Sequence, residues 1–100
     1  MANNVTQEHV TWAINRIQAV ARRRVSFAVW SDARDYMKAR GIDIDDIKEA
    51  LKECTWVYSQ VIGSVTRYRV QGIDTDKRTI LILLVLEDEL SIIEVIDVEL

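Results

Sequence analysis

The fold is decided by the second half of the chain, where residues 55–98 read TWVYSQVIGSVTRYRVQGIDTDKRTILILLVLEDELSIIEVIDV. Apolar and polar residues tend to alternate there with a period of two, which is typical of β-strands. Short polar or glycine-containing segments interrupt the alternation. Because strands joined by such short turns pair as antiparallel neighbours, the sequence predicts a β-meander of three to four strands. The strands are expected over 56–62, 65–73, 79–86 and 90–98.

The first half of the chain has helical spacing instead. Apolar residues recur every three or four positions from about 5 to 23, which predicts an amphipathic helix. An extended piece over 25–29 leads to a second helix, for which Ser31 is the expected N-cap and Gly41 the left-handed terminating residue. Asp43 is the expected N-cap of a third helix, because isoleucines before and after it have the spacing of a hydrophobic staple.

The order of these elements indicates the fold class. Three helices come before all four predicted strands, so we expect an α+β domain with the N-terminal helices packed on one face of the sheet. A chain of 100 residues is long enough to form one hydrophobic core and too short to form two. We therefore expect residues 1–100 to form a single domain.

Composition and charge exclude several classes of protein. The formal net charge of −3 is unusual for a protein that binds many phosphates. Cys54 is the only cysteine, which excludes an internal disulfide, and the chain lacks a Cys/His set with zinc spacing. The longest apolar run, 80–86, is far too short to span a bilayer, and the N-terminus does not resemble a signal peptide. We expect a cytoplasmic protein without a metal, a cofactor or a membrane partner.

Few residues could act as acids, bases or nucleophiles. His9 is the only histidine and is expected on the exposed first turn of the first helix. Cys54 ends the apolar stripe of the third helix and is expected to be a small core residue. A histidine-dependent hydrolase, a zinc enzyme and a P-loop enzyme are therefore unfavoured.

The strand over 65–73 carries the most suggestive residues. Alternation places Arg67 and Arg69 on one face, and Tyr68 on the other. The simplest interpretation is a solvated face. The functional interpretation is a row of guanidinium groups that hold phosphate, joined by Lys77 and Arg78 from the adjacent turn. Such a set could support metal-independent RNA cleavage in which the substrate's own 2′-hydroxyl is the nucleophile.

Glu94 interrupts an otherwise apolar row in the last predicted strand, which includes Ile92 and Ile96. If this carboxylate is buried, it needs a cationic partner. Arg67 or Arg69 could reach it in some strand registers. That ion pair would compete with RNA binding by the same arginines.

Several segments resemble a group of small bacterial toxins. Residues 33–43, ARDYMKARGID, are similar to the pattern His-Ala-x-x-x-Met-x-x-Arg-Gly-Ile, and 46–51 are similar to the helix that follows it. Residues 68–72, YRVQG, resemble a Tyr-Arg-Val-x-Gly strand, and 79–85 with 92–96 resemble the closing hairpin. These segments resemble the MqsR and BrnT toxins of the RelE-like superfamily. The resemblance covers about 26–98, with 25–100 as the toxin-like core and 1–24 as an additional N-terminal helix.

The resemblance implies a function and a site. Its members are mRNA-cleaving toxins of toxin–antitoxin pairs, so it implies a metal-independent endoribonuclease that contacts mRNA or the ribosome and is held by an antitoxin. The residues expected to act in catalysis are Arg67, Arg69 and Tyr68. The residues expected to bind RNA are Lys77, Arg78, Arg40 and Lys38.

A second hypothesis keeps the fold without the activity. The histidine of the toxin pattern is Asp32 here, and the chain is acidic whereas the relatives are often basic. Both departures favour a non-catalytic binding protein, such as a degenerate toxin, a regulator or an inhibitor carried by a mobile element. The two hypotheses remain open on sequence alone.

The strand over 79–86 predicts that the protein does not act alone. It is apolar on both faces, with Leu81, Leu83 and Val85 on one of them. A sheet covered by helices on one side normally keeps its other face polar. Either the N-terminal helix crosses to cover the second face, or another chain covers it. We expect a homodimer or a tight complex with an antitoxin or another protein.

Overall fold

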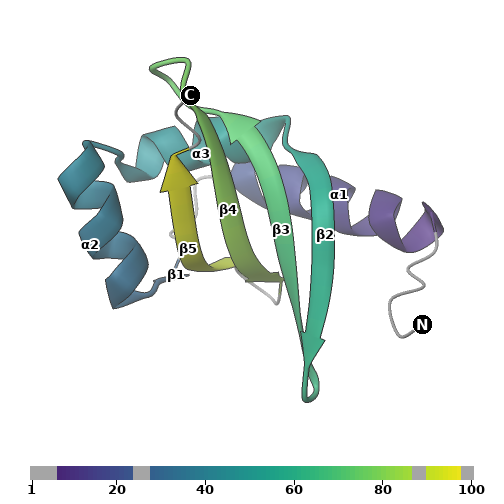
Figure 1. Cartoon of the computed structure of the whole chain (residues 1–100). Helices are drawn as coiled ribbons and strands as arrows, with labels where there is room; N and C mark the ends of the chain where they lie inside the picture. Colours follow the sequence, from purple (N-terminus) through teal and green to yellow (C-terminus); the bar gives the residue numbers. More distant parts are fainter. Residues whose placement is uncertain (1–6, 24–27, 87–89, 98–100) are drawn as a thin grey trace.

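The computed structural model describes residues 7–23, 28–86 and 90–97, which form an α+β fold (Figure 1). Its helices are α1 (Gln7–Ala21), α2 (Ser31–Arg40) and α3 (Ile44–Lys52). Its strands are β1 (Ala28–Val29), β2 (Thr55–Ile62), β3 (Val65–Ile73), β4 (Thr79–Leu86) and β5 (Leu90–Asp97). The predicted α+β class is confirmed.

The sheet differs from the predicted meander. It has five strands in the order β1-β5-β4-β3-β2 and is mixed rather than antiparallel. The strands from β2 to β5 pair antiparallel with their neighbours, but β1 pairs parallel with β5 through Ala28↔Ser91 and Val29↔Ile92. The prediction of three to four strands is therefore wrong, because a two-residue strand carries no alternation of its own and forms only where β5 offers a free edge.

The helices pack mainly on one face of the sheet (Figure 1). Helix α3 lies on β3, α1 packs on α3 and β2, and α2 packs on β5 at the edge of the sheet. The core between these layers is aliphatic, and its largest fully buried side chains are Ile17, Val20, Ile47, Leu51, Val70, Ile80, Ile82, Leu84, Ile92 and Val95. We call the other side of the sheet the open face. Since α1 packs on the helical side, it does not cover the open face.

Local signals determine where the helices begin and end. Asp43 accepts a hydrogen bond from the Asp46 amide and Asp46 accepts one from the Asp43 amide, so α3 starts with a capping box. Gly41 ends α2 with φ of 66°, as expected. Ser31 is not the N-cap that the sequence predicted. Trp30 takes that position, and Ser31 is the first residue of the helix.

Helix α3 lies unusually close to β3 at Gly72. A Cβ atom at this position would lie 2.0 Å from the carbonyl oxygen of Ala50. Only a residue without a side chain permits this approach. The contact sets the separation between the helical layer and the sheet.

A β-bulge in β5 changes which side chains reach the open face. Leu84 pairs with Ile92, whereas the preceding Leu83 pairs with Glu94. Since Leu83 and Leu84 point to opposite faces, Ile92 faces the helices and Glu94 faces the open side. The predicted row that placed Ile92 beside Glu94 is therefore wrong, because one extra residue in the bulge reverses the alternation.

Candidate binding surface on the open face of the sheet

Arg69 lies at the centre of the open face and is only 8% exposed. Its Nη2 donates to Oε1 of Glu94 at 2.5 Å, and its guanidinium carbon lies 5.9 Å from the centre of the Tyr58 ring. Burial alone would lower the pKa of Arg69, but the hydrogen bond and charge of Glu94, together with Tyr58, raise it. Arg69 is therefore a buried cation that contacts Glu94 from β5 and Tyr58 from β2.

Arg67 lies two residues earlier on the same face. Its guanidinium carbon is 5.7 Å from the centre of the Trp30 ring, a cation–π contact between β3 and the start of α2. Within the described part of the chain, buried Nε of Arg67 and buried Nη1 of Arg69 have no hydrogen-bond acceptor. Two buried guanidinium N–H groups on this face therefore donate no hydrogen bond to the described residues.

An apolar groove runs beside these arginines, between α2 and the sheet. It encloses about 470 Å³. Trp30, Ala33 and Tyr36 form one wall, and the other includes Leu83, Ile93 and Ile96. Asp32, Glu94 and Arg67 add charged groups to its lining. The groove therefore combines aliphatic and aromatic surface with a few polar groups, as sites that bind organic ligands or peptides do.

The predicted catalytic trio does not come together. Tyr68 faces the helices, opposite Arg67 and Arg69, as the alternation indicated, and is 4% exposed. Its hydroxyl forms a hydrogen bond of 3.0 Å with Nε2 of His9, and its ring makes an edge contact with Trp56. Burial raises the pKa of Tyr68, so its hydroxyl stays protonated near neutral pH.

His9 is the functional candidate that sequence reasoning missed. It was expected at the surface, but it is half-buried against Tyr68 and also lies near Trp12, with ring centres 5.6 Å apart. The sequence contained one indication that His9 is partly buried. His9 precedes buried Ala13 by four residues, so it lies on the buried side of α1.

The predicted RNA-binding cations lie elsewhere. Arg78 belongs to the turn after β3, and Arg67 lies six residue steps along the strand from Ile73, a distance of roughly 20 Å. Arg40 and Lys38 lie in the last turn of α2, where the Arg40 guanidinium stacks on Tyr36 at 5.5 Å. These cations form a group separate from Arg67 and Arg69.

Arg78 is occupied by structural contacts. It joins the β3–β4 turn to the α2–α3 junction through the oxygens of Asp74 (2.7 Å), Arg40 (2.8 Å), Asp76 (3.2 Å), Gly41 (3.3 Å) and Asp46 (3.6 Å). Asp74 also accepts hydrogen bonds from the Asp76 and Arg78 amides. This network fixes the turn and leaves Arg78 little capacity for a ligand.

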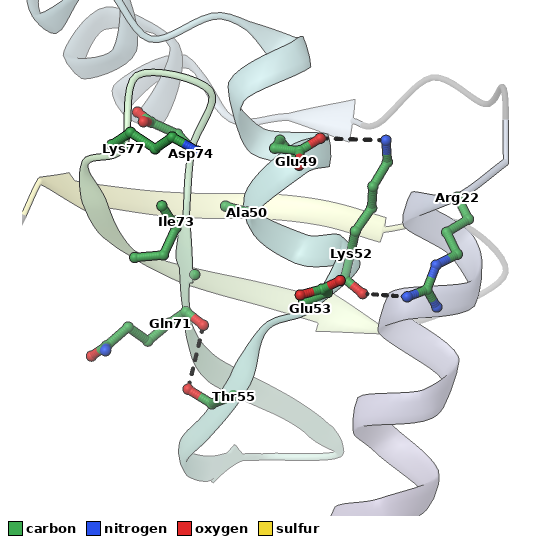
Figure 2. Close-up of a pocket in the computed structure, with 11 residues that line it drawn as sticks. Arg22, Glu49, Ala50, Lys52, Glu53, Thr55, Gln71, Ile73, Asp74 and Lys77 are labelled. Carbon is green, nitrogen blue, oxygen red and sulfur yellow. Dashed lines mark hydrogen bonds and ion pairs between the residues drawn. The ribbon is translucent and has the colours of Figure 1, made fainter.

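A second pocket of about 390 Å³ lies where α1, α3 and β3 meet, and Lys77 is on its wall (Figure 2). Some of the charged side chains that line it bond to other lining residues. Lys52 pairs with Glu49 at 3.4 Å, and Arg22 donates to the Lys52 carbonyl at 2.9 Å. The lining is mostly polar, and some of its charged groups already bond one another, so this pocket is a weaker candidate than the largely apolar groove.

Three further observations bear on function. The described residues contain no group of three potential metal ligands. Among those same ranges, no helix is long and apolar enough to cross a membrane. Cys54 is buried, and this burial raises its pKa to about 11, so the thiol is poorly suited to nucleophilic chemistry.

No family model, curated protein or solved structure matches the chain.

Proposed function

We propose that this protein is a non-catalytic binding protein that receives a protein partner on the open face of its sheet. The observation that carries the proposal is the division of the predicted catalytic trio. Arg67 and Arg69 lie on the open face beside an apolar groove, whereas Tyr68 is buried on the helical side. The arginines are already stacked on Trp30 and Tyr58.

The composition of the face supports a protein partner. Aromatic residues and arginine are enriched at the centres of protein interfaces, and here they surround an aliphatic groove. Ile96 is 37% exposed at the groove, and Trp30 is 49% exposed. We place the protein in the cytoplasm on a RelE-like scaffold, with either a second copy of the chain or an antitoxin-like protein as the partner.

The test compares two substitutions at equally exposed positions. Ile96→Lys places a charge in the groove, and Ile44→Lys places one on α3, where isoleucine is also 37% exposed. Light scattering of the purified chain, and co-purification with a genetically adjacent protein, should detect an assembly that Ile96→Lys abolishes and Ile44→Lys preserves. A monomeric wild type that binds neither itself nor that protein would contradict the proposal.

One observation favours metal-independent RNA cleavage as a second candidate function. The hydrogen bond between His9 and Tyr68 brings together a histidine and a tyrosine that the sequence did not suggest as a pair, and Trp12 beside it is exposed and able to stack on a base. Toxicity would then depend on His9 rather than on the arginine strand alone.

Inducing expression separates the two functions. A toxin should arrest growth and cleave mRNA in the presence of EDTA, and both His9→Ala and a double Arg67→Ala/Arg69→Ala change should remove the effect. The binding-protein proposal expects no arrest and no cleavage by the wild type. Cleavage by wild type that either variant abolishes, with its fold retained, would favour the toxin.

A further inference from the structure

The open face holds two hydrogen-bond donors without acceptors among the described residues. They are Arg67 Nε and Arg69 Nη1, and both atoms are buried. Guanidinium donors removed from water are costly unless an acceptor replaces the lost water. Arg67 is the more telling case, because it lines the groove, whereas Arg69 lies outside that lining and already bonds Glu94.

Arg78 provides a comparison, because its guanidinium group has a purely structural role in the same chain. Oxygens of Asp74, Asp46 and neighbouring groups surround it at 2.7–3.6 Å. The arginines of the open face lack such a set. Their position beside the groove suggests that the missing acceptors come from outside the chain.

We infer that the groove binds a partner segment in which a carboxylate lies next to an aliphatic or aromatic side chain. The carboxylate would accept a hydrogen bond from Arg67, which lines the groove, and would lie near the charge of Arg69 on the same face, since guanidinium and carboxylate match in geometry and charge. The neighbouring side chain would occupy the space between Tyr36, Leu83 and Ile96. This inference rests on the proposed function and names the chemistry of its partner.

The surroundings favour a carboxylate over a phosphate. Asp32 and Glu94 both line the groove, and their charges oppose the successive phosphates of a nucleic-acid strand more than the single carboxylate of a peptide side chain. The remaining lining is mostly apolar, which suits a peptide better than a sugar–phosphate backbone. Glu94 already demonstrates the contact, since its own carboxylate occupies Nη2 of Arg69.

Trp30 is the residue that must move when the segment binds. Its ring lies over the Arg67 guanidinium, whose Nε is buried. Trp30 is 49% exposed at the N-cap of α2, and its side chain makes no capping hydrogen bond within the described structure. A shift of the indole would open Arg67 to the ligand without unwinding the helix.

Titration with hexanoate, observed by nuclear magnetic resonance, tests the inference. Hexanoate joins a carboxylate to an aliphatic chain, and hexanamide is the matched uncharged probe. Hexanoate at millimolar concentration should shift the Trp30 indole N–H and Arg67 Nε–H signals with saturation. Hexanamide should bind about tenfold more weakly, because it lacks the charge.

Two variants identify the groups involved. Arg67→Gln should weaken hexanoate binding about tenfold, and Glu94→Gln should strengthen it severalfold by removing the competing carboxylate. Lys77→Gln, in the turn between β3 and β4, should have no effect. If Arg67→Gln fails to fold, hexanoate binding to Glu94→Gln still tests the inference.

Equal binding of hexanoate and hexanamide, or no saturable shift with either, would overturn the inference. So would unchanged binding in Glu94→Gln. Such results leave the proposed function standing if Ile96→Lys still abolishes assembly. Conversely, an assembly that Ile96→Lys does not abolish contradicts the proposed function, whether or not hexanoate and hexanamide bind.

Discussion

Arg69 on β3 and Glu94 on β5 form an ion pair that crosses the intervening strand β4, with Nη2 and Oε1 2.5 Å apart. Leu83 pairs with both residues and lies beneath the contact. The ion pair therefore covers an aliphatic side chain on the face that lacks helices, which explains why Leu83 is buried there.

The first prediction concerns the coupling free energy between Arg69 and Glu94. In a double-mutant cycle with Arg69→Met and Glu94→Gln, urea unfolding should give a coupling free energy of about 1–2 kcal/mol, moderated because the Glu94 side chain is 47% exposed. The exposed Lys52–Glu49 pair is the control, and its coupling should be below about 0.5 kcal/mol. Additive effects of the Arg69 and Glu94 changes would contradict the prediction.

Gly72 and Gly63 provide a matched pair of glycine substitutions. Gly72→Ala should lower the free energy of unfolding by about 3 kcal/mol or more, because its Cβ would overlap the Ala50 carbonyl oxygen at 2.0 Å. Gly63→Ala meets no atom of the described structure within 4 Å and should cost only about 1 kcal/mol, from its φ of 64°. Urea denaturation checks both values, and equal losses would show that α3 does not lie so close to β3.

Asp46 should make stability depend on acid pH. Burial alone would raise its pKa, but hydrogen bonds from Thr75 and the Asp43 amide, with the charge of Arg78, lower it below 3.8. The stabilisation is complete above the unfolded pKa of 3.8 and is lost as pH falls through the lower folded value. Unfolding measured from neutral to acid pH should show a steeper loss for wild type than for Asp46→Asn.

Asp45 is the control for that experiment. It lies in the same helical turn but is exposed, so Asp45→Asn should retain the acid sensitivity of the wild type. If the Asp45 and Asp46 variants have the same pH profile, the contacts of Asp46 with Thr75 and Arg78 do not stabilise the fold.

Cys54 gives a prediction about reactivity. Burial raises its pKa to about 11, so little thiolate forms at mildly alkaline pH. Labelling with a disulfide reagent should be at least ~100-fold slower in the folded protein than in urea. Rapid labelling of the folded protein would show that the end of α3 is open to solvent.

Local signals predicted much of this structure. Period-two alternation located β2 to β5, and the Asp43 N-cap with its flanking isoleucines located the start of α3, because these residues lie within about one helical turn of one another. Alternation also placed Arg67 and Tyr68 on opposite faces. Each of these features depends on residues that are close in sequence.

The remaining features depend on contacts between distant segments. Strand β1 forms only against β5, and the bulge that turns Glu94 toward Arg69 arises from the pairing of β5 with β4. The contact of His9 with Tyr68 joins α1 to β3. Periodicity could not predict these features. The candidate groove requires the bulge and, in addition, the packing of α2 beside β5, which also joins distant segments.

Site-specific photo-crosslinking from the groove tests the central claim most directly. A photoreactive p-benzoylphenylalanine in place of Ile96 should yield one adduct of defined mass in the cells that make the protein, identified by mass spectrometry as a second copy or as a specific partner. The same group in place of Ile44, which is equally exposed on α3, should not yield it, and Arg67→Glu should suppress it. Absence of an adduct from position 96, or the same adduct from both positions, would contradict a partner on the open face.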